Sequence, residues 1–474
     1  MPRSLRANWW ARACAAFVLC AATAITLPAQ TFKTLHSFDS TDGSEPIAGL
    51  IQGTDGNLYG TTFGGGTNGG YGTVYRITTG GTLTSLQSFD TSDGSFPGAG
   101  VVQGRDGNFY GTTSLGGANT CLPEFATCGA VFRITPSGTL TVLHSFDGSD
   151  GAGPESTLVQ GADESFYGTT QFDGAHGYGT VFKITPGGTL TTLYSFCSQN
   201  DCADGAEPQA GLLLATDGNL YGTTFGYPGI LAQYGTVFKI TPDGTLTTLH
   251  TFSGADGAEP FGTLIQSSGN LYGTTYIGGA VDFGTIFKIS LTGAFTTLYS
   301  FCSQSGCADG TGPVAGLTEA TDGNLYGTTY LGGAHGGGTA FQITPNGRLT
   351  VLHSFNFNGN PEGVLLQDTN GTLYGTTQTG GSNNDGTVFS LSIGLGPFVK
   401  TQPTSGKVGA AVKILGTYLA DATSVTFNGT AATFSVVSPS LLTTTVPAGA
   451  TTGEVKVIKT KGTVRSNVPF RVIP

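Results

Sequence analysis

The sequence predicts an all-β protein whose main part is a seven-bladed β-propeller. Glycine supplies 78 of the 474 residues and charged side chains only 10%, against averages of about 7% and about 25%. A phrase of the form DGNLYGTT recurs seven times, and its tyrosines lie 48 to 57 residues apart, at Tyr59, Tyr110, Tyr167, Tyr221, Tyr272, Tyr326 and Tyr374. A period of about 50 residues is typical of propellers and of arrays of small sheets.

Residues 1–30 have the pattern of an export signal. Arg3, Arg6 and Arg12 precede the apolar run ACAAFVLCAATAITL, and LPA, ending at Ala29, is a suitable cleavage site. The apolar run is shorter than the roughly 20 residues that span a bilayer. We therefore expect a secreted or cell-surface protein, with a periplasmic location left open.

The net charge restricts the partners. Removing the signal leaves 16 basic and 30 acidic residues, and such an acidic protein repels nucleic acid and anionic lipid. The six cysteines that remain form three pairs that are close in sequence. In an exported chain this spacing predicts three loop disulfides, Cys121 with Cys128, Cys197 with Cys202 and Cys302 with Cys307.

One repeat, residues 48–89, contains four expected strands: AGLIQ, NLYGTT, GTVYRIT and TLTSLQSF. In the third strand Val74 points to one face while Tyr75 and Ile77 point to the other, so both faces carry large apolar groups. A sheet of this kind is buried on both sides. Propeller blades are packed face to face in this way.

The order of strands predicts that the ring closes. A fourth strand, TFKTLHSF at residues 31–38, stands alone at the start, and the last repeat lacks its own fourth strand. The N-terminal strand is therefore expected to complete the last four-stranded blade of a propeller over residues 31–394. The alternative, an open solenoid, would leave a free edge at each end, which proteins avoid.

The repeated pattern DGNLYGTT..GG....GTVFKITP.GTLT.LHSF resembles the GloVer (Gloeo-Verruco) tandem repeat of exported bacterial proteins over residues 31–394. The seventh repeat departs most, because NGNPEG is shorter and Asn358 replaces aspartate. The resemblance implies no particular reaction.

Residues 397–474 lose the repeat and read as short alternating strands, such as VKILG, SVTFNG and GEVKVI. The segments SG..G..V.I.G, V.FNG..A.F and VP.GATTG.V.V resemble an IPT/TIG domain. The resemblance implies an immunoglobulin-like β-sandwich that serves as a spacer or binding domain and brings no catalytic residue.

If the first strand of each repeat is innermost, the long loops share one face of the disc, and that face is the candidate for binding. It is expected to carry the aspartates of a DGxxP-like segment: Asp42, Asp93, Asp150, Asp204, Asp256 and Asp309. A ring of six carboxylates could bind Ca²⁺. Alternatively, each aspartate accepts bonds from its own turn. We prefer the second role, because one aspartate per repeat spreads the oxygens apart, and we predict no cofactor.

Aromatic side chains just before the third strand are the candidate ligand-binding residues: Tyr71, Tyr178, Tyr234 and Phe283. They could stack on sugar rings or peptide side chains, or they could cover the ends of the sheets. His176 and His335, in two similar GAHG loops, have no neighbouring partner with metal-ligand spacing.

These observations predict a monomeric, non-catalytic binding or structural module. Its partner would be a protein or polysaccharide of the cell surface or surroundings. The alternative is an extracellular polysaccharide lyase or hydrolase, which requires acidic or basic side chains from different blades to converge. The positions of Asp163, Glu164, His176 and His335 distinguish the two.

Overall fold

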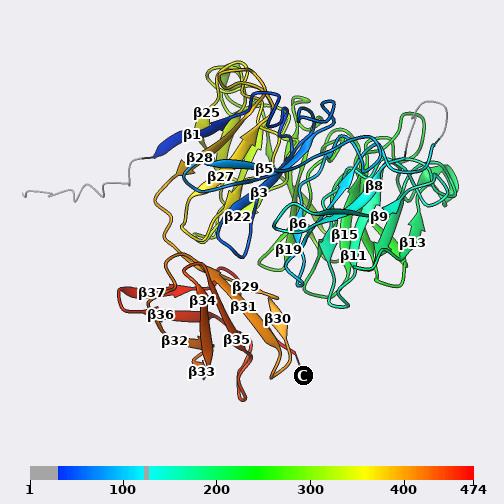
Figure 1. Ribbon diagram of the computed structural model, residues 1–474. Coiled ribbons are helices and arrows are strands. Elements are labelled where there is room, and N and C mark those ends of the chain that lie inside the picture. The colour runs from blue at the N-terminus through cyan, green and yellow to red at the C-terminus, as the bar shows by residue number, and fades with distance from the viewer. Residues whose placement is uncertain (1–29, 122–127, 474) are drawn as a thin grey trace, which may run out of the picture.

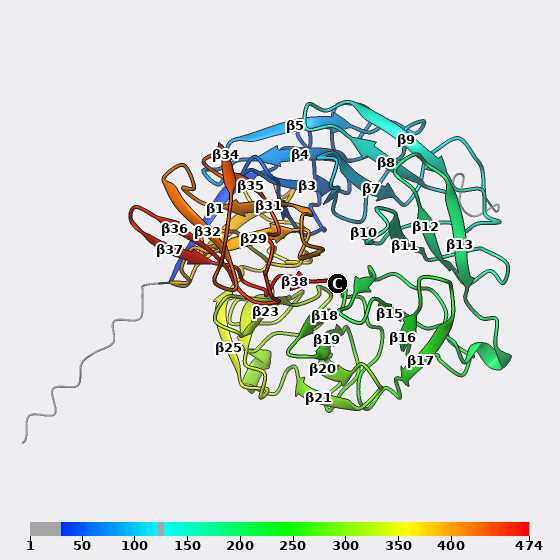
Figure 2. The ribbon, with the colours of Figure 1, turned by 90° about the horizontal axis from the view of Figure 1, so that it is seen from below.

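The computed structural model describes residues 30–121 and 128–473, and most of the predicted export signal lies outside these ranges. The repeat region forms small four-stranded antiparallel sheets arranged as propeller-like blades around a centre, and a second all-β domain follows it (Figures 1 and 2). Across the described ranges, no helix has the length and hydropathy needed to cross a bilayer.

We number the sheets one to seven in the order of their inner strands. Sheets one to three contain β2 (Ile51–Gln52), β3 (Leu58–Thr62), β4 (Thr73–Ile77) and β5 (Leu83–Ser88); β6 (Val102–Gln103), β7 (Phe109–Thr113), β8 (Ala130–Ile134) and β9 (Leu140–Ser145); and β10 (Val159–Gln160), β11 (Phe166–Thr170), β12 (Thr180–Ile184) and β13 (Leu190–Ser195). Sheets four and five contain β14 (Leu213–Leu214), β15 (Leu220–Thr224), β16 (Thr236–Ile240) and β17 (Leu246–Thr251); and β18 (Ile265–Ser267), β19 (Asn270–Thr275), β20 (Thr285–Ser290) and β21 (Phe295–Ser300).

Sheet six contains β22 (Thr318–Glu319), β23 (Leu325–Thr329), β24 (Thr339–Ile343) and β25 (Leu349–Ser354). Sheet seven contains β26 (Leu366–Gln367), β27 (Leu373–Thr377), β28 (Thr387–Ser392) and, as its outer strand, β1 (Thr31–Ser37). The register runs from Thr31 opposite Ser392 to Ser37 opposite Thr387. The expected pairing of the N-terminal strand with the last repeat is therefore present. Two single turns of 3₁₀ helix, η1 (Asn200–Cys202) and η2 (Ser305–Cys307), lie between sheets.

The inner strands are shorter than the sequence suggests. Only Ile51 and Gln52 of the expected segment AGLIQ pair as a strand. The preceding residues contact the neighbouring sheet instead, since Thr376 Oγ1 donates to the Ala48 carbonyl at 3.0 Å. The innermost segments are therefore bound to two sheets at once.

The apolar core lies between sheets rather than inside any one of them. Val74 packs against sheet two, whereas Tyr75 and Ile77 pack against sheet seven, as the alternation in the sequence predicts. Comparable buried clusters join each successive pair of sheets through to sheets six and seven. Because every sheet is buried on both faces, each depends on its two neighbours.

The residues of the YGTT phrase meet the demands of this crowded packing. Tyr59 stacks on Phe109 of the next sheet with ring centroids 4.0 Å apart. A Cβ on Gly60 would lie 2.6 Å from the Tyr75 hydroxyl, so only glycine fits there. Thr61 Oγ1 donates to the Ala99 carbonyl of sheet two at 2.9 Å, and Thr62 Oγ1 bonds Thr73 Oγ1 at 2.8 Å. The phrase thus joins strands and sheets.

The glycine before each third strand is required by its backbone and by its surroundings. Gly72 has a φ of +97°, and a Cβ there would lie 2.5 Å from the Thr62 carbonyl oxygen and 2.6 Å from Pro97 Cδ of the next repeat. Left-handed backbone and close approach are the two conditions that select glycine. This position therefore sets how closely consecutive repeats approach.

The C-terminal domain consists of two four-stranded sheets and a short strand pair. They are formed by β29 (Val399–Gln402), β31 (Ala411–Gly416), β35 (Leu441–Thr445) and β34 (Phe434–Ser438); by β33 (Thr430–Ala432), β32 (Ala422–Phe427), β36 (Val455–Lys459) and β37 (Gly462–Arg465); and by β30 (Ser405–Gly406) with β38 (Arg471–Val472). Val412, Ile414, Val425, Val457 and Phe470 belong to its single core.

The C-terminal domain contacts the end of the propeller that carries the tight turns, and β38 reaches toward the centre of the ring (Figure 2). Residues 31–396 contain 8 basic and 28 acidic side chains, whereas residues 397–474 contain 8 basic and 2 acidic ones. Several polar side chains of the second domain donate to turn carbonyls of the first: Lys400 to Gln367, Gln402 to Gln103, Lys413 to Arg105, Ser440 to Thr54 and Arg471 to Thr216. The opposite charges favour this docking.

The packing predicts that the N-terminal strand carries as much stability as any internal one. Phe38, which follows β1, and Phe146, which follows β9, are both fully buried between sheets. We expect Phe38→Ala and Phe146→Ala to lower the free energy of unfolding by similar amounts, about 3–5 kcal/mol. Chemical denaturation of both variants measures this. A Phe38→Ala cost near zero would contradict an equal contribution of the N-terminal strand to stability.

A second prediction concerns an unmatched hydroxyl in sheet two. Thr113 Oγ1 is buried without a hydrogen-bond partner, because Ala130 replaces the threonine that faces it in the other sheets. We expect Ala130→Thr to stabilise the protein by about 0.5–1.5 kcal/mol. The matched control, Thr236→Ala, removes the 2.8 Å bond to Thr224 in sheet four and should destabilise. If thermal unfolding shows that both variants are more stable, or that both are less stable, than the wild type, the assignment of an unmatched Thr113 hydroxyl is contradicted.

Candidate functional site

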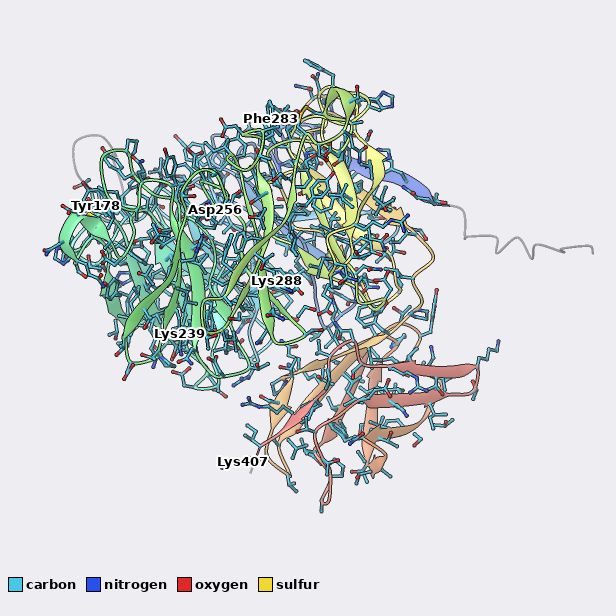
Figure 3. The ribbon with its side chains drawn as sticks, turned by 180° about the vertical axis from the view of Figure 1, so that it is seen from behind. Tyr178, Lys239, Asp256, Phe283, Lys288 and Lys407 are labelled. Carbon is cyan, nitrogen blue, oxygen red and sulfur yellow. A yellow bond between two sulfur atoms is a disulfide. The ribbon has the colours of Figure 1, made fainter. Side chains whose placement is uncertain are left out.

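The two ends of the propeller differ in their connections. Loops between second and third strands, and between one sheet and the next, gather at the end away from the C-terminal domain; we call this the loop end. Figure 3 shows Tyr178 and Phe283 there, whereas Lys239 lies toward the end that faces the C-terminal domain. The tight turns at that second end are partly covered by β29 and β38. The loop end is therefore the free surface.

Exposed apolar side chains gather on the loop end. Among the described residues of the repeat region, the exposed large apolar side chains all lie in loops: Tyr227, Leu231, Tyr234, Val281, Phe283, Leu331 and Phe357. These residues belong to the connections of sheets four to seven. Concentrations of exposed apolar groups mark interaction sites more often than scattered ones do. The part of the loop end formed by sheets four to seven is therefore the candidate interaction surface.

The predicted aromatic residues occupy this end, in two kinds of surroundings. Tyr71 is half-buried and meets the Phe96 ring edge-on at 5.7 Å, and Tyr178 meets Tyr227 at 5.5 Å. Tyr234 and Phe283 are 39% and 45% exposed. The first two therefore cover the ends of sheets, while the last two present free rings.

The predicted aspartates bind their own turns. Asp42 accepts bonds from His36 Nε2 at 2.7 Å and from the Asp39 backbone at 3.1 Å. The fully buried Asp204 accepts bonds from the Tyr194 hydroxyl and the Ser198 backbone. Equivalent bonds hold the remaining members, Asp93, Asp150, Asp256 and Asp309.

These bonds agree with the turn-organising role and explain why His, Gln or Tyr recurs on the outer strand. Among the described residues, no group of three or more His, Cys, Asp or Glu side chains is arranged to hold a metal ion. A calcium site on the aspartates stays a prediction.

All three predicted disulfides are present, each within one loop: Cys121–Cys128, Cys197–Cys202 and Cys302–Cys307. The second and third enclose η1 and η2 at equivalent places, between sheets three and four and between sheets five and six. They fix loops at the loop end rather than joining sheets.

The four residues proposed to distinguish an enzyme do not converge. Asp163 and Glu164 lie in the turn between β10 and β11, at the opposite end of β11 from His176. His335 lies in the loop between β23 and β24, three sheets from His176. Any catalytic site would therefore need other residues.

The sequence reading missed a set of glutamates next to the chosen aspartates. Glu45, Glu207 and Glu259 immediately precede the proline of the DGxxP-like segment and have left-handed backbone, with φ of 55°, 57° and 55°. Gly153 and Gly312 occupy the same position in two other repeats, where no side chain opposes that conformation. Phe96 and Asn360 stand there in the remaining two repeats, with φ of 57° and 47°, so the left-handed backbone is common to the repeats and the carboxylate is found in three of them. In the sequence, these glutamates could have been found by comparing the residue before the proline among the repeats.

The clearest convergence joins residues of several repeats in a group that we call the channel-mouth cluster: Glu45, Tyr276, Tyr330, Glu362 and Gln378. Tyr330 donates to Gln378 Oε1 at 3.1 Å. Burial, reinforced by the negative charge of Glu45, raises the pKa of Glu362 to about 7. Burial and the neighbouring Glu362, Tyr276 and Glu45 also raise the pKa of Tyr330.

The channel-mouth cluster draws its residues from sheets five, six and seven and from the segment before sheet one. It offers carboxylates and a carboxamide as acceptors, tyrosine hydroxyls as donors, and ring faces for stacking. Such a group can bind sugar hydroxyls or the polar groups of a peptide.

Two families match the chain. The Gloeobacter/Verrucomicrobia repeat matches residues 21–227, 123–308 and 228–433, and the IPT/TIG domain matches residues 398–472. No curated protein matches.

Among solved structures, a fungal alcohol oxidase of the AA5 family, in complex with copper, is 14% identical with a TM-score of 0.53, covering 94% of this chain and 99% of its own. A gluconolactonase from Xanthomonas campestris is 14% identical with a TM-score of 0.40, covering 79% of this chain and 93% of its own. At these identities the likeness concerns the fold alone. The chain belongs to the Gloeobacter/Verrucomicrobia repeat family and ends in an IPT/TIG domain.

Proposed function

We propose that the protein is an exported, non-catalytic binding module that recognises a polysaccharide or protein of the cell surface or surroundings. The ligand meets the loop end of a closed seven-bladed propeller. The C-terminal domain, an immunoglobulin-like sandwich, occupies the other end and leaves the loop end free.

The observation that carries the proposal is the confinement of exposed apolar side chains to one end of the propeller. Tyr227, Tyr234 and Phe283 place exposed rings on the same end as the channel-mouth cluster. Rings supply large contact area, and convergent polar groups supply orientation. The charge-assisted bonds of carboxylates to hydroxyls suit a hydroxyl-rich ligand such as a polysaccharide. We therefore rank a polysaccharide above a protein.

The loop end predicts which substitutions abolish binding. The double variant Tyr234→Ala, Phe283→Ala should bind glycans at least about ten-fold more weakly, which corresponds to about 1.4 kcal/mol. The matched control, Val437→Ala with Ile458→Ala, removes exposed apolar groups of the C-terminal domain, 59% and 42% exposed, and should leave binding unchanged. A glycan array of the mature protein and both double variants provides the measurement. Binding that survives the first double variant and is lost in the control would contradict the proposal.

A second candidate function, depolymerisation of an extracellular polysaccharide, is favoured by Glu362. A carboxyl with a pKa near the working pH can act as a general acid or base. Glu45 would be the second carboxylate beside it, as in pairs whose pKa values are pushed apart. If the protein is an enzyme, Glu362→Gln should abolish the release of reducing ends or unsaturated sugars from the polysaccharide. Equal activity in Glu362→Gln and the wild type would remove this candidate.

Glu362 also predicts a pH-dependent difference in stability. Its folded pKa, about 7, lies above the ordinary value of 4.5, so the folded protein loses stability as pH rises between these values. At pH values below this range the wild type carries a neutral carboxyl, and Glu362→Gln should unfold at nearly the same temperature. Above the range Glu362→Gln should unfold at a higher temperature, because it lacks the buried charge beside Glu45. An equal shift at both pH values, measured by thermal unfolding, would contradict the assignment.

A further inference from the structure

A small pocket lies between the inner strands of the propeller and the C-terminal domain, at the opposite end from the loop end. Its volume is about 210 Å³, and its walls include Leu50, Glu319, Leu365, Phe398, Lys400 and Asn467. We call it the floor pocket. Figure 2 shows the C-terminal domain approaching the centre of the ring from this side.

The charged groups at the floor pocket break the repeat. Glu319 stands where most repeats have glutamine, such as Gln52, Gln103 and Gln367. Those glutamines accept a bond from a backbone N–H of the neighbouring turn, as Gln103 Oε1 does from Thr54 at 2.9 Å. Glu319 also joins two sheets, because its Oε1 accepts a hydrogen bond from Ser267 Oγ at 2.7 Å. A neutral glutamine joins sheets at this position in other repeats. The negative charge of Glu319 is therefore not required for joining sheets.

Lys400 supplies a basic side chain to the lining of the same pocket. Lys400 extends from β29, and its Nζ donates to the Gln367 carbonyl at 2.8 Å, which uses one of three ammonium donors. Burial lowers the pKa of Lys400 to about 8, so the amine is mainly protonated at neutral pH. Nearby, Asp368 replaces the Gly, Ala or Ser of the other repeats, and its Oδ1 is buried without a partner in the described structure. Asp368 is not part of the pocket lining, but its negative charge opposes the effect of burial on the pKa of Lys400. Glu319 and Lys400 are the two charged side chains of a lining that also contains Leu50, Leu365 and Phe398.

We propose that the floor pocket binds a small zwitterion, an α-amino acid with an apolar side chain. The ligand carboxylate accepts bonds from Lys400 Nζ, and its ammonium donates to Glu319. Its side chain packs against Leu50, Leu365 and Phe398. Opposite charges on one apolar wall match both the charges and the side chain of such a ligand, whereas a simple anion would meet repulsion from Glu319. This site is separate from the proposed binding surface at the loop end.

Calorimetric titration of the full mature protein with leucine tests the proposal. Two half-ligands separate the contacts: 4-methylpentanoate lacks the ammonium, and isoamylamine lacks the carboxylate. Leucine should bind saturably and more tightly than either. Glu319→Gln restores the residue of the other repeats; it should weaken leucine at least about ten-fold, or 1.4 kcal/mol, and leave 4-methylpentanoate unchanged. Lys400→Met should weaken both.

Lys407→Met is the matched control, because Lys407 is an exposed lysine at the far tip of the same domain (Figure 3). It should bind leucine like the wild type. The proposal is overturned if the wild type shows no saturable binding of leucine, or if Glu319→Gln binds leucine with unchanged affinity. Should Lys400→Met fail to fold, Glu319→Gln still decides, since glutamine occurs at this place in other sheets. Loss of glycan binding at the loop end would not affect this outcome.

Discussion

Burial of both faces of every small sheet is the constraint on which the rest of the structure depends. A two-sided sheet cannot stand alone, so each needs a neighbour on either side. Val74 and Tyr75, adjacent in one strand, belong to cores shared with different neighbours. A linear stack would leave one face bare at each end. The use of β1 as the outer strand of sheet seven, together with the cluster that joins sheets seven and one, removes that exposed surface.

The repeated phrase follows from this crowding. Sheets that meet near a centre leave little room, so Gly60 and Gly72 are fixed by contacts that no side chain could tolerate. Threonine hydroxyls pair across strands or bond the next sheet, which satisfies polar groups that water cannot reach. Where one partner changes, as at Ala130, the remaining hydroxyl is left without a bond. Repetition in this chain therefore records a packing requirement.

Much of this was predictable because periodic features answer local rules. The parity of residues in the third strand predicted which face each side chain takes, and the position of TFKTLHSF predicted its partner. The channel-mouth cluster was not predictable in the same way. Glu45 and Glu362 come from segments over 300 residues apart, and their approach depends on how the last sheet packs against the first. The docking of the C-terminal domain was also hidden, because the net charge of the whole chain conceals a basic domain beside an acidic one.

Function in a repeat protein is best sought where the repeat fails. Residues shared by all sheets are already explained by packing, whereas a change in one sheet that costs energy or adds charge needs a separate reason. Glu362 is a buried carboxyl beside Glu45, and burial together with the charge of Glu45 raises the pKa of Glu362. Glu319 and Asp368 add charge near the axis where other repeats have neutral side chains, and the exposed rings lie only on sheets four to seven of the described propeller. The departures gather at two places along the axis, the loop end and the floor pocket. A set of similar sheets therefore acquires its specific surfaces through a small number of residues that differ from sheet to sheet. The packing of the residues that the sheets share fixes the positions of these differing side chains.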